Sequence, residues 1–176
     1  MLVIGISACL LGEPVRYDGG DKKNPLLSAL ADKQVRYIPI CPEAGCGLGV
    51  PREPMRLEGN PHSPRLLTIE SRRDKTGILT QWCENRLFFL QQQNPAGFIF
   101  KNRSPSCGLS GVQVTTSPSH TTTGIGLFAQ QIKASLPTLP MAEGDDLNSS
   151  ATIEHFLELV AAFASENYAS KGTDHG

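Results

Sequence analysis

Residues 1–9 read Met1-Leu2-Val3-Ile4-Gly5-Ile6-Ser7-Ala8-Cys9, and this stretch decides the fold. The apolar run from Leu2 to Ile6 contains β-branched residues and is typical of a strand buried in a parallel sheet. Two later runs, Val35 to Ile40 and Gly97 to Phe100, have the same character. Because segments with helical periodicity alternate with these runs, we expect a single-domain, layered α/β fold with a mainly parallel sheet.

Apolar side chains recur at helical spacing in four segments, and weaker signals mark two more strands. The pattern predicts helices over 26–33, 82–93, 124–134 and 152–169, and short strands over 66–70 and 136–141. Prolines and glycines indicate a long structured loop over 41–65, and the Ser/Thr-rich stretch 115–123 is expected to be a surface loop. The length of 176 residues suggests one domain over 1–169, followed by a flexible tail over 170–176.

Three of the five cysteines lie just past the ends of predicted strands, each in a loop rich in Gly, Pro or Ser. Cys9 follows the first strand, Cys41 follows the second, and Cys107 comes after the third strand and a short loop. Ligand sites in α/β folds gather at the carboxyl ends of strands, so we expect these cysteine loops to form a shared site there. The chain has no C-x-x-C motif, and the spacing leaves an iron–sulfur centre, a zinc site and unbound reactive thiols open.

The two remaining cysteines have different expected positions. Cys46 follows Cys41 closely, and three roles stay open for it: a ligand, a neighbour of the site, or a packed side chain. Cys83 falls on the inward face of the predicted helix 82–93, beside Leu87, which favours a place in the core.

Composition narrows the range of functions. A net charge of −1, with both signs mixed along the chain, argues against a nucleic-acid-binding surface. No stretch approaches the length of a membrane span, and the N-terminus lacks the basic and apolar segments of a signal peptide. A cytoplasmic location is therefore expected, where thiols stay reduced and can bind metal or react.

Polar side chains beside the cysteine loops are candidates for chemistry. Glu43 stands just past Cys41, where a carboxylate can activate water as a general base; an ordinary turn charge is the alternative. Ser104 and Ser106 precede Cys107, and a hydroxyl there can relay a proton or donate to developing charge. For Ser106 the plain role of a turn residue is favoured.

Two cations are close in sequence to the same loops. Arg16 and Lys101 are candidates to orient a polar substrate or to lower the pKa of a thiol. Pairing with nearby acids is the simpler role for both.

The cysteine loops contain recognisable motifs. They are Ser7-Ala8-Cys9-Leu10-Leu11-Gly12-Glu13, Val15-Arg16-Tyr17-Asp18-Gly19, Cys41-Pro42-Glu43, Gly47-Leu48, Pro51-Arg52 and Ser104-Pro105-Ser106-Cys107-Gly108. In combination these motifs resemble the thiouracil desulfidase family of bacteria, which was long catalogued only as a domain of unknown function. The similarity runs from Met1 to about Met141.

The resemblance implies a cofactor, a reaction and a set of site residues. The cofactor is a [4Fe-4S] cluster held by Cys9, Cys41 and Cys107, with one iron free of protein ligands. The resemblance also implies that Glu43 is the catalytic acid or base and that Ser104 is the catalytic serine. The implied reaction removes sulfur from a thiolated nucleobase without net redox change, and its products are the oxo base and sulfide.

The leading hypothesis is therefore an iron–sulfur thiouracil desulfidase that cleaves a C–S bond in a small thiolated base, with no nucleic-acid or membrane partner. Iron is thiophilic, and coordination makes a thiocarbonyl carbon electrophilic, so the physical logic agrees. Two alternatives are a cluster-free enzyme that transfers sulfur through a cysteine persulfide and a non-catalytic metal-binding module. Cys46 departs from the expected family pattern and would block substrate if it reached the free iron. The turn over 143–146 and the last helix are expected to be local additions.

Overall fold

The computed structural model describes residues 1–30 and 35–172, and two four-stranded sheets organise this part of the chain. Sheet A has the strand order β2-β1-β5-β8 with parallel pairing throughout, and sheet B has the order β4-β3-β6-β7 with mixed pairing. The strands are β1 (Leu2–Ser7), β2 (Val35–Ile40), β3 (Met55–Glu58), β4 (Arg65–Thr68), β5 (Gly97–Phe100), β6 (Val112–Ser117), β7 (His120–Gly124) and β8 (Met141–Glu143). The helices are η1 (Ala8–Leu11), α1 (Pro25–Ser28), α2 (Pro42–Gly45), α3 (Thr76–Gln92), α4 (Leu127–Ser135) and α5 (Ser150–Gly172).

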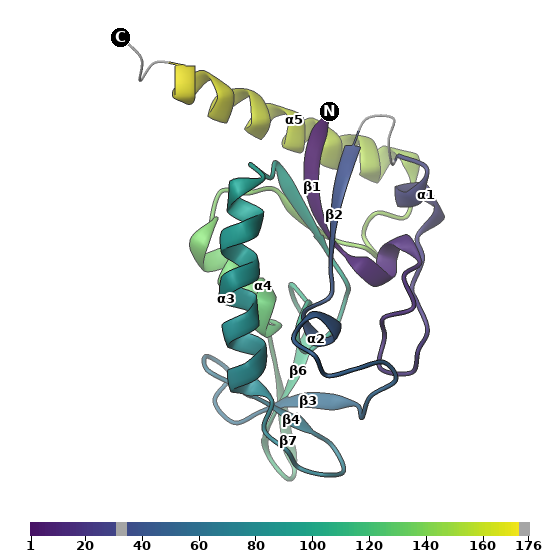
Figure 1. The fold of residues 1–176 in the computed structure, drawn as a ribbon, viewed down its shortest axis with the longest axis vertical. Helices are drawn as coiled ribbons and strands as arrows, with labels where there is room; N and C mark the ends of the chain where they lie inside the picture. Colours follow the sequence, from purple (N-terminus) through teal and green to yellow (C-terminus); the bar gives the residue numbers. More distant parts are fainter. Residues whose placement is uncertain (31–34, 173–176) are drawn as a thin grey trace.

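Helices cover both faces of sheet A and produce the layers of an α/β fold. On one face, side chains of α3 and α4 form a core cluster with Phe98 and Phe100 of β5. On the other face, side chains of α1 and α5 form a second cluster with Ile4 and Ile6 of β1. Figure 1 shows α3 and α4 beside the sheet and α5 across its upper end. The predicted α/β fold with a parallel sheet is confirmed.

Side-chain alternation along β1 explains why a glycine stands in the middle of this apolar strand. Ile4 and Ile6 belong to the cluster with α5, so residue 5 faces the opposite side of the sheet. There the ring of Phe98, the register partner of Gly5 on β5, lies so close that a Cβ on Gly5 would be 2.3 Å from a ring carbon. The aromatic ring fills the space that the missing side chain leaves.

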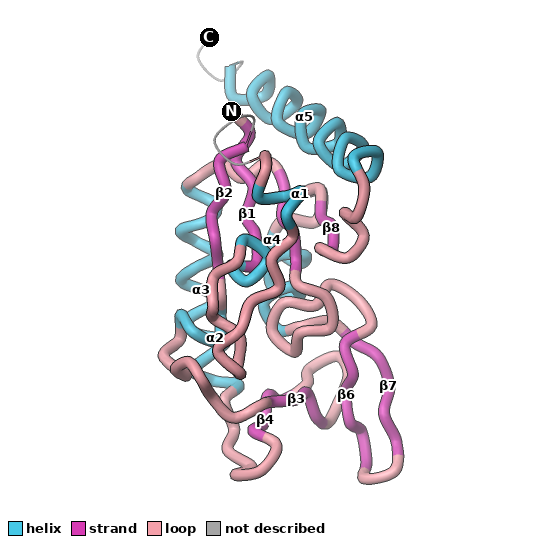
Figure 2. Tube along the Cα trace, turned by 90° about the vertical axis from the view of Figure 1, so that its right-hand side faces the viewer, coloured by secondary structure: helices cyan, strands magenta, loops and turns pink. Residues whose placement is uncertain are grey.

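Parallel pairing brings the carboxyl ends of three strands together at one end of sheet A. β2, β1 and β5 are neighbours, and Ser7 at the end of β1 is in register with Ile40 at the end of β2. The segments that follow these strands are the Cys9 loop (residues 8–24), the Cys41 loop (41–54) and the Cys107 loop (101–111). Figure 2 shows sheet B beyond this end of sheet A and α5 at the opposite end of the molecule.

The sequence pattern predicts one strand of sheet B, since the expected strand over 66–70 is observed as β4 (Arg65–Thr68), but it misses the other three. Residues 115–123 belong to the hairpin of β6 and β7, so the expectation of a surface loop there is wrong. The Ser/Thr composition resembles that of a loop, but threonine is β-branched and suits a strand. The segment 41–65 likewise holds α2 and β3 rather than one continuous loop. Since β3 pairs with β4 and with β6, it joins two distant segments into one sheet.

Two helices begin at residues other than the predicted ones. α3 begins at Thr76 rather than Trp82, because the Asp74 carboxylate accepts hydrogen bonds from the amide and the hydroxyl of Thr76 and orders the first turn. α4 begins at Leu127 rather than Gly124, since Gly124 still belongs to β7. The buried face of α3 consists of Leu79, Cys83, Leu87 and Leu90.

The start of α1 agrees with the sequence pattern, but its end does not. Asn24 caps the helix by accepting hydrogen bonds from the amides of Leu26 and Leu27. The helix ends at Ser28, earlier than predicted, and positions 31–34 lie outside the described residues.

The last two elements lie near their predicted places. Strand β8 begins at Met141, at the very end of the predicted strand 136–141. α5 extends to Gly172, so the predicted tail begins inside this helix, and positions 173–176 lie outside the described residues. In the described part of the chain, no helix combines the length and the apolar character needed to cross a membrane.

The start of α4 lies against the backbone of the Cys107 loop, and this contact yields a stability prediction. A Cβ on Gly126 would lie 2.6 Å from the carbonyl carbon of Ser106 and 2.8 Å from the amide nitrogen of Cys107. Because backbone atoms cannot rotate away, Gly126→Ala is expected to lower the free energy of unfolding by roughly 1–3 kcal/mol. Urea unfolding measures the change.

Gly77→Ala is the matched control for that variant, because a Cβ at this position of α3 meets no atom within 4 Å. It is expected to leave the free energy of unfolding unchanged or to raise it by up to about 1 kcal/mol. A Gly126→Ala protein as stable as the unmodified one would contradict the close packing at the start of α4.

Candidate functional site

One cavity of about 310 Å³ lies where the three cysteine loops meet. Its wall includes Cys9, Cys41, Cys107, Glu43, Ser104, Arg16 and Lys101, together with Ser106, whereas Cys46 is not part of it. Pro54 and Met55, at the start of sheet B, form another part of the wall. The structure therefore brings together candidates from three segments that are distant in sequence.

The turn η1 holds Cys9 directly after β1. It ends at Gly12, whose φ of 92° is a left-handed conformation that suits glycine. The carbonyl of Cys9 accepts a hydrogen bond from the amide of Lys22 at 2.9 Å, and the carbonyl of Leu10 accepts one from the amide of Asn24 at 2.8 Å. These bonds fold the Cys9 loop back on itself and leave Cys9 only 7% exposed.

Cys41 is the N-cap residue of α2, a short helix of four residues. Pro42 occupies the first helical position, where its missing N–H costs no hydrogen bond. The carbonyl of Cys41 accepts from the amide of Gly45 at 2.8 Å and closes the turn, which places Glu43 beside the thiol. The thiol of Cys41 donates to the carbonyl of Val15 at 3.8 Å and so contacts the Cys9 loop.

The N-terminus of α4 holds the Cys107 loop in place. The first amides of a helix have no partner within it and need acceptors elsewhere. Here the amide of Leu127 donates to the carbonyl of Pro105 at 3.0 Å, and the amide of Phe128 donates to the carbonyl of Ser106 at 2.9 Å. The loop is therefore fixed by backbone bonds next to Cys107, which is buried.

Cys9 and Cys107 are buried and Cys41 is half-buried close to them, and loss of solvent raises the pKa of each thiol. Burial raises the pKa of Cys9 to about 11, and the neighbouring Cys41 adds to the effect. Burial also raises the pKa of Cys41, and it raises that of Cys107 well above the ordinary value, again with a contribution from Cys41. Three adjacent thiolates therefore need a compensating positive charge, such as a metal centre.

The donor set fits an iron–sulfur cluster. Cysteine thiolates are the usual protein ligands of such clusters, and here three of them line one cavity. In the part of the chain that the structure describes, no group of three or more His, Cys, Asp or Glu side chains is arranged to hold a single metal ion. In a cluster each thiolate binds a different iron, so the thiols need not converge on one point.

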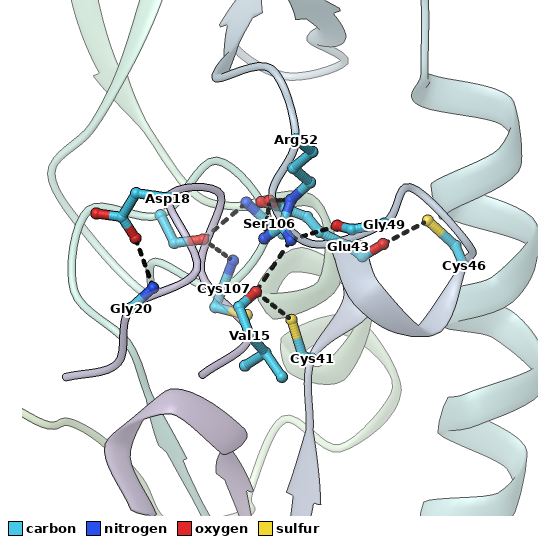
Figure 3. A network of polar contacts seen from close by, with 11 residues as sticks. Val15, Asp18, Gly20, Cys41, Glu43, Cys46, Gly49, Arg52, Ser106 and Cys107 are labelled. Carbon is cyan, nitrogen blue, oxygen red and sulfur yellow. Dashed lines mark hydrogen bonds and ion pairs between the residues drawn. The ribbon is translucent and has the colours of Figure 1, made fainter. Parts of the chain in front are cut away.

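Glu43 is a buried carboxylate that is held from two sides (Figure 3). Its Oε2 accepts from Nε and Nη2 of Arg52, both at 2.8 Å, and its Oε1 accepts from the hydroxyl of Ser106 at 2.7 Å. The side chains of Arg52 and Glu43 are 7% and 12% exposed, so the ion pair lies largely away from solvent. Charge-assisted hydrogen bonds of this kind fix the orientation of the carboxylate.

Arg52 is a site residue to which the sequence analysis assigns no role. Its Nη1 donates to the carbonyl of Val15 at 3.0 Å and to that of Gly49 at 2.9 Å. The guanidinium therefore joins Glu43, the Cys9 loop and the end of the Cys41 loop. The sequence does contain a signal, since Pro51-Arg52 is one of the recognised motifs, but the motif does not say which carboxylate the arginine meets.

The two serines before Cys107 make different contacts. Ser106 lies in a turn, as expected, but it is also 1% exposed and donates to Glu43, a contact that the sequence does not indicate. The hydroxyl oxygen of Ser104 accepts from the amides of Ser106 at 3.2 Å and Cys107 at 3.0 Å. Both contacts use the oxygen as an acceptor, which leaves the hydroxyl hydrogen of Ser104 to donate toward the cavity.

Cys46 turns away from the three thiols of the cavity. Its thiol donates to the carbonyl of Glu43 at 3.4 Å, and the residue belongs to the same core cluster as Cys83. Figure 3 shows its sulfur on the side of α2 that faces α3, away from Cys41 and Cys107. Of the three roles left open for Cys46, the structure supports that of a packed side chain. Cys83 is fully buried in the core, as predicted.

Both candidate cations lie at the cavity wall. Lys101 donates from Nζ to the carbonyl of Asn102 at 2.6 Å, and burial lowers the pKa of this lysine. Arg16 lies 3.6 Å from the carboxylate of Asp18. The charges of Lys101 and Arg16 lower the pKa of Cys9, although burial has the larger, opposite effect. They supply positive potential beside the thiols, and their role in substrate binding stays a prediction.

Comparisons with known proteins agree with this geometry. A family model described as 2-thiouracil desulfurase matches residues 4–144. The fold is similar to the solved structure of a [4Fe-4S]-dependent thiouracil desulfidase, TudS, with a TM-score of 0.68 and 31% sequence identity, over 84% of this chain and 93% of that chain. No curated protein matches the chain. The matched residues 4–144 include all the candidate residues at the cavity wall.

Removal of Arg52 tests the energetic importance of the buried ion pair. Arg52→Met takes away both donors to Oε2 of Glu43 and leaves a buried, uncompensated carboxylate. The free energy of unfolding is expected to fall by about 3 kcal/mol in urea denaturation at neutral pH. The double variant Arg52→Met/Glu43→Gln, in which no unpaired charge remains, is expected to recover part of this loss.

Arg65→Met is the control, because it breaks an ion pair with Asp74 whose side chains are 63% and 40% exposed. The expected loss is below about 1 kcal/mol, since solvent screens exposed pairs. Equal losses in the Arg52 and Arg65 variants would contradict the buried character of the Arg52–Glu43 pair.

Proposed function

Because the chain belongs to the 2-thiouracil desulfurase family, we propose that it is a [4Fe-4S]-dependent, non-redox desulfidase that acts on thiouracil or a similar small thiolated nucleobase. The products are the oxo base and sulfide. The observation that carries the proposal is a cavity whose wall contains two buried thiols, one half-buried thiol and one oriented carboxylate.

Cys9, Cys41 and Cys107 would hold the cluster, with one iron free of protein ligands. When bound, the cluster supplies a thiophilic Lewis acid that polarises a thiocarbonyl group. The raised pKa values of Cys9 and Cys107 favour a metal centre over a cluster-free persulfide enzyme. A neutral thiol is a poor nucleophile, whereas metal coordination stabilises the thiolate.

Glu43 would accept a proton from the water that attacks the thiocarbonyl carbon. Arg52 and Ser106 hold both of its oxygens, so the base is oriented before substrate arrives. In the overall reaction a C–S bond breaks and a C–O bond forms. Water is the only co-reactant, and no electrons are exchanged.

Ser104 would donate its hydroxyl hydrogen to the ring or to the departing sulfur, because two backbone amides fix its oxygen. Arg16 and Lys101 would bind the polar edge of the substrate. The cavity of about 310 Å³ would have to take both the cluster and the substrate, which supports a small free base as the substrate.

Replacement of individual cysteines tests the ligand set. Cys9→Ser, Cys41→Ser and Cys107→Ser are each expected to lose most of the iron and sulfide that the unmodified protein takes up in anaerobic reconstitution, since each removes one ligand. Cys46→Ser and Cys83→Ser are the controls and are expected to keep full iron content. Iron, zinc and acid-labile sulfide analyses give the result. Iron-free protein that contains zinc, or a Cys46→Ser variant without a cluster, would refute the assignment.

Glu43→Gln tests the proposed base. The substitution keeps the shape of the side chain but removes its ability to take up the proton, so the cluster should be retained. Sulfide release from 2-thiouracil is expected to fall by roughly 100- to 10,000-fold. Glu84→Gln, at an exposed position on α3, is the control and should keep full turnover. Unchanged turnover in Glu43→Gln would remove Glu43 from the mechanism.

A further inference from the structure

A second buried carboxylate lies behind the cavity and has no part in the proposed reaction. Glu143 ends β8, is 8% exposed, and is not among the residues of the cavity wall. A buried carboxylate is costly unless donors satisfy it, so its partners show what it does.

Among the described residues, the carboxylate of Glu143 accepts hydrogen bonds from four donors, and all four belong to the Cys107 loop. Oε1 accepts from the amides of Leu109 at 2.8 Å and Ser110 at 3.2 Å. Oε2 accepts from the side-chain amide of Asn102 and from the hydroxyl of Ser110, both at 3.1 Å. The carboxylate therefore ties the beginning of the loop to its end, on either side of Cys107.

The residues directly after Glu143 reach the Cys9 loop. The side-chain amide of Asn24 donates to the carbonyl of Gly144 at 3.3 Å and to that of Leu147 at 3.0 Å. We call the segment Glu143–Leu147 the brace, because it bonds to the Cys9 loop on one side and to the Cys107 loop on the other.

Close packing reinforces the contact of the brace with the Cys9 loop. A Cβ on Gly144 would lie 2.8 Å from the side chain of Leu10, the residue after Cys9. The amide of Asp145 donates to the side-chain oxygen of Asn102 at 2.9 Å, which adds a further bond to the Cys107 loop. Both thiol-bearing loops are thus held against the same short segment.

We propose that Glu143 is a positioning residue that sets the relative placement of the Cys9 and Cys107 loops before the cluster binds, an inference that rests on the proposed function. A carboxylate has only acceptors and therefore matches four donors. Loops held in place beforehand lose less conformational entropy when they bind a cofactor. The expectation that the 143–146 turn is a local addition is wrong for Glu143 and Gly144, which lie within the matched residues 4–144.

Glu143→Gln tests the proposal, because glutamine has the same size but carries an NH2 group that cannot accept hydrogen bonds from these donors. After anaerobic reconstitution, an iron chelator is expected to remove iron from the variant about 10-fold faster than from the unmodified protein. The decrease in the visible absorption of the cluster measures this rate. Asp146→Asn changes an exposed carboxylate of the same turn and is the control, with iron loss at the unmodified rate. An unmodified rate in Glu143→Gln would overturn the proposal.

A second measurement uses metal-free protein. Cys107 is 6% exposed, and a loosened loop would open it to reagents. Alkylation of Cys107 by iodoacetamide, followed by peptide mass spectrometry, is expected to be about 10-fold faster in Glu143→Gln, with Cys83 as the buried internal reference. The two proposals are therefore tested by different measurements. Unmodified protein that binds no iron refutes the proposed function, whereas an unchanged rate of Cys107 alkylation in Glu143→Gln refutes the positioning role of Glu143.

Ser110→Ala decides the question if Glu143→Gln does not fold. It removes one of the four bonds to the same carboxylate and lies at an exposed position. Iron loss and Cys107 alkylation are both expected to be about 3-fold faster than in the unmodified protein. Unmodified rates in both measurements would overturn the proposal.

Discussion

The parallel pairing of β1 with β2 and β5 is the constraint on which the site depends. Parallel neighbouring strands point the same way and are joined by crossover connections. The loops that follow their carboxyl ends therefore lie together at one end of the sheet. Register matters as much as direction, because a slip of one residue would turn the side chains of β1 to the wrong face. Ile4 and Ile6 would then leave the α5 side, and the ring of Phe98 would no longer cover Gly5. The packing of β1 in the hydrophobic core thus determines the position at which the Cys9 loop begins.

Charge is the second organising factor at this end of sheet A. Three thiols that resist ionisation lie beside one carboxylate, and Arg52 is the cation that meets this carboxylate directly. A buried ion pair adds little net stability compared with an apolar pair of the same shape, because both charges lose their hydration. What the Arg52–Glu43 pair supplies is orientation, since Arg52 also bonds to carbonyls of two different loops. The same side chain therefore orients the Glu43 carboxylate and joins the two loops beside it.

Local patterns in the sequence predict the strands and the cysteine loops, because apolar runs and turn residues act over short distances. The same patterns do not predict which side chains meet. Ser106 and Glu43 are 63 positions apart, and nothing near either residue indicates the hydrogen bond between them. Strands β3, β6 and β7 of sheet B are missed for a related reason, since they are rich in polar residues, and β3 and β6 pair across a long separation in sequence. The start of α3 is missed because the turn before it depends on hydrogen bonds from Thr76 to the Asp74 carboxylate, which apolar periodicity does not reveal.

Sheet B has a consequence for how such a protein can diversify. Its strands come from segments that contain none of the three thiols, yet the start of β3 forms part of the cavity wall at Pro54 and Met55. Substitutions at Pro54 and Met55 can therefore reshape this wall, while sheet A alone determines where the three cysteine loops begin. The shape of this part of the cavity can thus vary without any change in the strands that carry the three thiols.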